Sequence, residues 1–66
     1  MIRYYVNNDT DSKGDHEVHR KDCDKLPSNR KDLGEFDNCR DAVTEAKKTY
    51  SKSNGCWHCS RECNTQ

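Results

Sequence analysis

The sequence has 66 residues, 29% hydrophobic and 36% charged, which excludes a large self-sufficient core and predicts a single small domain over residues 1–66. Its 12 basic and 12 acidic side chains cancel, which argues against a protein whose main work is non-specific nucleic-acid binding. No apolar run approaches the roughly 20 residues that cross a membrane, so we expect no membrane association.

The first half of the chain predicts strands joined by polar turns. Residues 2–6 alternate apolar and polar side chains, as does the shorter segment 16–19, and the polar stretch 7–15 between them is typical of a hairpin loop. A turn follows at Leu26-Pro27-Ser28-Asn29. Residues 33–36 form a weaker third strand, in which we expect Gly34 to make a bend or bulge.

The second half predicts one helix and a terminal knuckle. Asp37 or Asn38 can cap the helix, and an apolar stripe then recurs at helical spacing. The stripe consists of Cys39, Ala42, Val43, Ala46 and Tyr50. Ser53-Asn54-Gly55 should end the helix in a turn, and residues 60–63 can form a last helical turn. The predicted core consists of Tyr4, Val6, Val18, Leu33, Phe36, Ala42, Val43, Ala46 and Trp57.

These elements indicate an α+β fold: a small two- or three-stranded antiparallel sheet with one helix. So short a chain usually needs a disulfide, a metal or oligomerisation to remain folded, and it carries five cysteines. We therefore expect a metal- or disulfide-stapled C-terminal knuckle, that is, one held in place by such a cross-link. We expect the domain to be a monomer.

Two ligand-bearing motifs predict a zinc site. His19-x3-Cys23 supplies an imidazole and a thiol, and Cys56-x2-Cys59 can present two sulfurs to one ion. Cys63 is an alternate ligand, because on a helical turn it would share a face with Cys59. His16 is a weaker alternative, since residues 16 and 19 of a strand point to opposite faces.

The remaining cysteines leave the choice between metal and disulfide open. Five is an odd number, and the N-terminus does not resemble a signal peptide, so we expect a cytoplasmic protein in which metal explains the cysteines better than disulfides. Cys39 can be a free buried thiol on the apolar helix face. Alternatively, a Cys39–Cys63 disulfide can accompany a metal site that uses the other three cysteines.

Residues around the two motifs are candidate partner contacts. Trp57, the only tryptophan, either covers the core or stacks on a partner, and His58 follows it. Arg20 and Lys21 begin a locally basic segment that aspartates dilute. The partner is a protein or a nucleic acid.

The arrangement of motifs resembles a known family. His19-Arg20-Lys21-Asp22-Cys23, Phe36 before a helix, and Gly55-Cys56-x-x-Cys59 resemble the zinc-binding domain at the N-terminus of the Ada DNA-repair protein and its shorter relatives, over residues 16–59. The whole chain is similar to a set of uncharacterised small bacterial proteins. In Ada the zinc is bound by Cys-x3-Cys and Cys-x2-Cys, and the first cysteine accepts a methyl group from DNA. Here His19 stands at that position, so the resemblance implies the metal site and argues against the repair chemistry.

Three functions follow in order of preference. The first is a zinc-stapled, non-catalytic binding module. The second is a disulfide-stabilised structural or interaction domain without metal, in an oxidising compartment. The third is a zinc-thiolate methyl acceptor or redox protein, although Cys-x-x-Cys here follows the helix instead of preceding it. The sequence contains no carboxylate pair, Ser/His/Asp set or phosphate-binding loop, so we expect no hydrolase.

Overall fold

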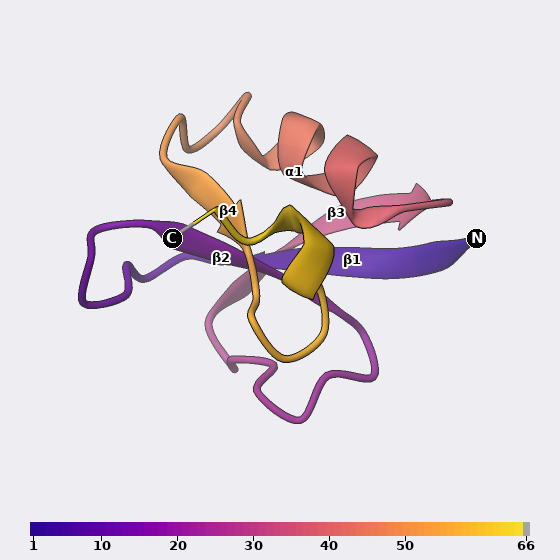
Figure 1. Ribbon diagram of the computed structural model, residues 1–66, viewed down its shortest axis with the longest axis horizontal. Coiled ribbons are helices and arrows are strands. Elements are labelled where there is room, and N and C mark those ends of the chain that lie inside the picture. The colour runs from indigo at the N-terminus through magenta and orange to yellow at the C-terminus, as the bar shows by residue number, and fades with distance from the viewer. Residues whose placement is uncertain (66) are drawn as a thin grey trace.

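The computed structural model describes residues 1–65, which form one α-helix packed on a four-stranded mixed sheet (Figure 1). The elements in chain order are β1 (Ile2–Asn7), β2 (His16–Arg20), β3 (Arg30–Phe36), α1 (Cys39–Ala46), β4 (Ser53–Gly55) and the 3-10 helix η1 (Arg61–Cys63). The sheet order is β3-β1-β2-β4, with β1 antiparallel to both β2 and β3. The predicted α+β class is therefore confirmed.

The register of the hairpin gives the sheet two different faces. Tyr4 and Val6 of β1 are buried against α1, and the pairing of Val6 with Val18 places Val18 on the same face. Tyr5 pairs with His19, so the alternation of strand side chains puts His19 on the opposite face. The segments 21–29 and 56–60 also lie on that side of the sheet, away from α1 (Figure 1).

The predicted irregularity at Gly34 is confirmed. The register between β1 and β3 shifts by one residue, because Tyr4 pairs with Gly34 whereas Tyr5 pairs with Asp32. Gly34 adopts a φ of 101°, a conformation that glycine tolerates better than other residues. The bulge leaves Leu33 buried in the core.

Helix α1 begins as predicted but ends early. The side chain of Asn38 accepts a hydrogen bond from the backbone N–H of Asp41 at 2.8 Å, and α1 then ends at Ala46. The extension of the helix to Tyr50 was wrong. The Tyr50 ring instead stacks on His16 with ring centroids 3.8 Å apart, and its hydroxyl donates to the Asn8 side chain. These tertiary contacts outweigh the helical periodicity.

Strand β4 was also missed, because Ser53-Asn54-Gly55 predicted only a turn. The segment pairs in parallel with β2, which makes the sheet four-stranded and mixed, and all three of its residues are buried. The buried Asn54 side-chain oxygen accepts hydrogen bonds from the backbone N–H groups of Gly55 and Thr65. These bonds satisfy a polar group that burial would otherwise penalise.

The core matches the prediction except that Cys39 joins it and Trp57 does not. Its buried residues are Tyr4, Val6, Val18, Leu33, Cys39, Ala42 and Ala46, with Phe36, Val43, Tyr50 and Cys63 packed against them. Trp57 is not among them: its side chain is 53% exposed, so its assignment to the core was wrong. The knuckle leaves this ring exposed to solvent.

Candidate metal centre

Four potential ligands converge below the sheet. The Sγ atoms of Cys23, Cys56 and Cys59 and a ring nitrogen of His19 all lie within 4.8 Å of one another. His19 Nδ1 is 3.6 Å from Cys23 Sγ and 4.0 Å from Cys59 Sγ. Cys23 Sγ is 3.9 Å from Cys56 Sγ. These residues could hold a metal ion, and they are the four that the sequence predicted.

Hydrogen bonds of the backbone place both motifs. His19 lies in β2, and a turn closed by the bond from Cys23 N–H to the Arg20 carbonyl brings Cys23 back beneath it. Cys56 continues the line of β4, because its N–H donates to the Val18 carbonyl at 2.9 Å. The Ser60 N–H then donates to the Cys56 carbonyl and closes the knuckle that carries Cys59.

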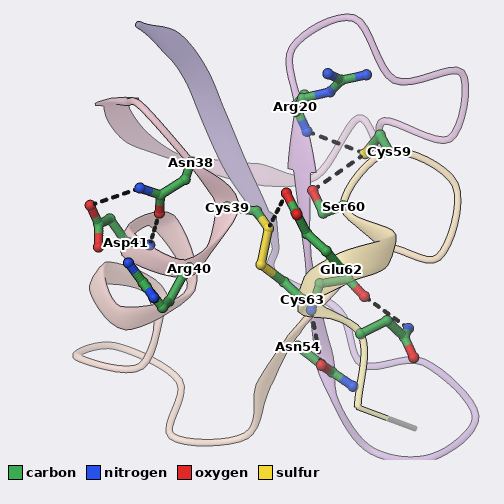
Figure 2. The surroundings of a disulfide bond; sticks show 12 residues. Arg20, Asn38, Cys39, Arg40, Asp41, Asn54, Cys59, Ser60, Glu62 and Cys63 are labelled. Carbon is green, nitrogen blue, oxygen red and sulfur yellow. Dashed lines mark hydrogen bonds between the residues drawn. A yellow bond between two sulfur atoms is a disulfide. The ribbon is translucent and has the colours of Figure 1, made fainter.

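Donors from the backbone also point at the sulfurs. The Arg20 N–H lies 3.3 Å from Cys59 Sγ, and the Lys25 N–H lies 3.4 Å from Cys23 Sγ. The Ser60 hydroxyl also reaches Cys59 Sγ, at 3.9 Å (Figure 2). Such donors stabilise a thiolate more than a neutral thiol. The cluster is therefore prepared for deprotonated sulfur.

Burial favours the neutral forms of His19, Cys56 and Cys59 in the absence of a cation. It raises the pKa of Cys59 to about 12 and raises the pKa of Cys56 as well. Burial, with a smaller contribution from His58, lowers the pKa of His19. Its imidazole therefore stays neutral at pH values where an exposed histidine would be protonated. A neutral imidazole can coordinate a metal directly, whereas each thiol must first lose its proton.

The two alternate ligands lie outside the cluster. His16 Nδ1 is 2.9 Å from the Asn7 carbonyl, and its ring stacks on Tyr50 on the helix side of the sheet. Cys63 is bonded to Cys39, so its sulfur is occupied. The disulfide joins the start of α1 to the end of η1, with Cα atoms 6.2 Å apart (Figure 2). The structure thus contains both the Cys39–Cys63 disulfide and a separate cluster that could bind a metal.

The predicted partner contacts lie on the knuckle and at the end of β2. Trp57 is exposed and the guanidinium of Arg61 lies 4.5 Å above its ring, and His58 and Lys21 are also exposed. Arg20 is half-buried, and its Nε is 3.5 Å from a carboxylate oxygen of Asp22. A hollow of about 470 Å³, lined in part by His58 and Arg20, opens next to Cys23 and Cys59. This hollow therefore adjoins the cluster on the side of Cys23 and Cys59.

Two residues near these features were missed. Glu17 Oε1 lies 3.6 Å from Nε2 of His19. The two-residue repeat of a strand could have indicated it, since residues 17 and 19 share a face. Arg61 follows the Cys-x-x-Cys motif, and no feature of the sequence predicted its position over Trp57.

Comparison with family models, with curated proteins and with solved structures finds no match. Among residues 1–65, no helix has the length and apolar character needed to span a membrane. The likeness to the Ada domain therefore remains a prediction, and the geometry of the cluster carries the functional argument.

Proposed function

We propose that this chain is a zinc-stapled domain in which His19, Cys23, Cys56 and Cys59 bind one structural zinc ion. The spacing of the ligand atoms carries this proposal. Tetrahedral zinc, with bonds of about 2.3 Å to sulfur and about 2.0 Å to nitrogen, separates its ligand atoms by roughly 3.5–3.8 Å. Three of the six separations, at 3.6, 3.9 and 4.0 Å, lie close to this range, and all six are within 4.8 Å, so the ligands need to move together by at most about 1 Å around the ion.

The chemistry of the donor set supports the same metal. Three thiolates and one imidazole suit zinc and favour it over the harder cations that prefer oxygen. Four protein ligands also fill a tetrahedral shell and leave no position for a substrate, which is the pattern of structural sites. The resemblance of the two motifs to the Ada zinc site supports the same assignment.

Cobalt substitution tests the site directly. Tetrahedral Co²⁺ bound to thiolates gives intense visible bands and sulfur-to-metal charge-transfer absorption, which zinc should abolish by displacing the cobalt. We expect one equivalent of Co²⁺ to saturate the wild-type protein, and Cys56→Ser to lose the charge-transfer intensity of one thiolate. His58→Ala, which changes an exposed knuckle residue, is the matched control. An octahedral spectrum, or one unchanged in Cys56→Ser, would contradict the proposal.

We further propose that the folded domain is a non-catalytic binding module that uses the exposed knuckle. The supporting observation is Trp57, a large ring that is 53% exposed with Arg61 stacked on it. Aromatic and arginine side chains are enriched where proteins contact partners, and an exposed ring can also stack on a nucleic-acid base. A disulfide-stabilised domain without metal would keep this surface while leaving the four-ligand cluster unexplained.

The single tryptophan makes the partner measurable. Saturable quenching of Trp57 fluorescence by a mixed-sequence single-stranded oligonucleotide would assign a nucleic-acid partner, and an unchanged spectrum would favour a protein partner. Under either assignment, Trp57→Ala should weaken binding at least tenfold, which corresponds to about 1.4 kcal/mol. Wild-type affinity in that variant would contradict the role of the knuckle.

A further inference from the structure

We propose that Glu17 is a positioning residue for the metal centre: its carboxylate accepts the Nε2–H of His19 and thereby holds Nδ1 toward the metal. This inference rests on the proposed zinc site and names a residue that acts through one of its ligands. Three independent observations support it: the orientation of the ring, the burial of its second nitrogen, and the strand position of Glu17.

The ring of His19 presents its two nitrogens to different surroundings. Nδ1 faces the sulfurs of Cys23 and Cys59 at 3.6 and 4.0 Å, so it is the atom placed to coordinate. The neutral ring carries only one proton, and a metal on Nδ1 requires that proton to be on Nε2. The arrangement of the sulfurs therefore fixes the tautomer that the site needs.

That tautomer needs an acceptor for the Nε2 proton. His19 is 1% exposed, and its Nε2 has no hydrogen-bond partner within 3.5 Å among residues 1–65. The carboxylate of Glu17 is close by, with Oε1 3.6 Å from this nitrogen. Buried N–H groups in proteins are almost always paired, and metal-bound histidines commonly donate to a carboxylate. A movement of a few tenths of an ångström would make this bond.

The fold holds Glu17 where it can act. Residues 17 and 19 lie on one face of β2, which is an interior strand between β1 and β4. The backbone of Glu17 pairs with that of Asn54 in β4, the strand that leads into the knuckle. This pairing fixes the position of Glu17 relative to the knuckle. Its side chain is 30% exposed, which leaves the carboxylate partly shielded from water beside the ring.

Competition with a chromogenic zinc chelator tests the inference. We expect Glu17→Ala to bind zinc about 10- to 100-fold more weakly than wild type, and Glu17→Gln to lose less because its amide oxygen can still accept the proton. Glu35→Ala, which removes an exposed glutamate from β3, is the matched control and should bind as wild type. Wild-type affinity in Glu17→Ala would overturn the inference, and if the alanine variant does not fold, wild-type affinity in Glu17→Leu, which also lacks an acceptor, would do the same.

Nitrogen-15 NMR of the histidine rings in the zinc-loaded protein gives a readout that a purely structural role would not move. We expect His19 to show metal on Nδ1 and a slowly exchanging proton on Nε2, and that proton should exchange faster in Glu17→Ala. Coordination through Nε2 would overturn the role of Glu17 while leaving the zinc site intact. If the wild-type protein binds no zinc, the proposed site fails and this inference fails with it.

Discussion

Three residues of the candidate metal site, His19, Cys56 and Cys59, are buried or half-buried in a way that favours their neutral forms. Burial raises the pKa of the Cys56 and Cys59 thiols, whereas it lowers the pKa of His19. Both shifts favour neutral forms, because a charge separated from water is costly. A divalent cation reverses this preference at the sulfurs and leaves the imidazole neutral.

Zinc affinity should therefore rise steeply with pH. Each thiol that is protonated before binding releases a proton, which contributes about a tenfold gain in affinity per pH unit for each proton released. Because burial lowers the pKa of His19 from its ordinary value of 6.5, the imidazole remains neutral at a pH somewhat below 6.5. Protons therefore compete little with the metal for this ligand in that range. Chelator competition between about pH 6 and about pH 8 measures the slope. Cys59→Ser should reduce it by about one proton, and a flat profile for wild type would contradict the account.

At the residue scale, the sequence predicted the ligands better than their surroundings. His19, Cys23, Cys56 and Cys59 are recognisable because metal-binding motifs have short internal spacing, which depends little on the rest of the fold. Cys63 is excluded from the ligand set because it forms a disulfide with Cys39. The sequence predicted this disulfide only as one of two alternatives for Cys39. The exposure of Trp57 depends on the conformation of the knuckle. The spacing of the Cys-x-x-Cys motif does not predict that conformation.

At the element scale, the segment from β4 to η1 forms the structural frame of the centre. Ser53-Asn54-Gly55 carries strong turn signals, yet pairing with β2 and the bonds to the Asn54 side chain make it a strand. Gly55 lies where this strand passes beneath the end of the chain. A Cβ atom there would come within 2.6 Å of the Ser60 carbonyl oxygen and within 2.7 Å of the Cys63 Cβ.

Gly55→Ala should accordingly destabilise the domain. The added methyl group meets backbone and a disulfide-bonded residue, which cannot move aside as a flexible side-chain end would. We expect a loss of about 1–3 kcal/mol in the free energy of unfolding, measured by denaturant titration of the zinc-loaded protein. His58→Ala, on the exposed side of the same knuckle, should change stability by less than about 0.5 kcal/mol. Equal stability of wild type and Gly55→Ala would show that the segment is not tightly packed.

At the scale of the whole molecule, the disulfide and the proposed metal site complement a small core. A metal ion bound by the cluster would connect the end of β2 to the knuckle, and the disulfide connects α1 to η1 over a separation of 24 residues. The core between them contains only seven buried residues among those described, and two of these are alanines. A chain of this size gains little from apolar burial alone, so each cross-link should contribute a large share of the stability.

The two cross-links should therefore act separately. Reduction of the disulfide should cost about 3 kcal/mol while leaving the zinc site able to bind, because a loop of this length constrains the unfolded chain by roughly that amount. Removal of zinc with a chelator should lower the melting temperature further, and both treatments together should unfold the chain. Melting curves under the four conditions test this, with Cys39→Ala/Cys63→Ala as the control that reductant should not affect. Equal melting temperatures with and without chelator would contradict a structural metal.

Native mass spectrometry of protein purified without chelator, followed by thiol counting after denaturation with chelator, tests the central claim most directly. Of the five cysteines, Cys39 and Cys63 form the disulfide while Cys23, Cys56 and Cys59 are free. We predict one zinc ion per chain, with one disulfide retained and the three cluster thiols becoming reactive once the zinc is removed. A metal-free chain whose cluster thiols react at once in the native state, or are oxidised to one another, would contradict the account.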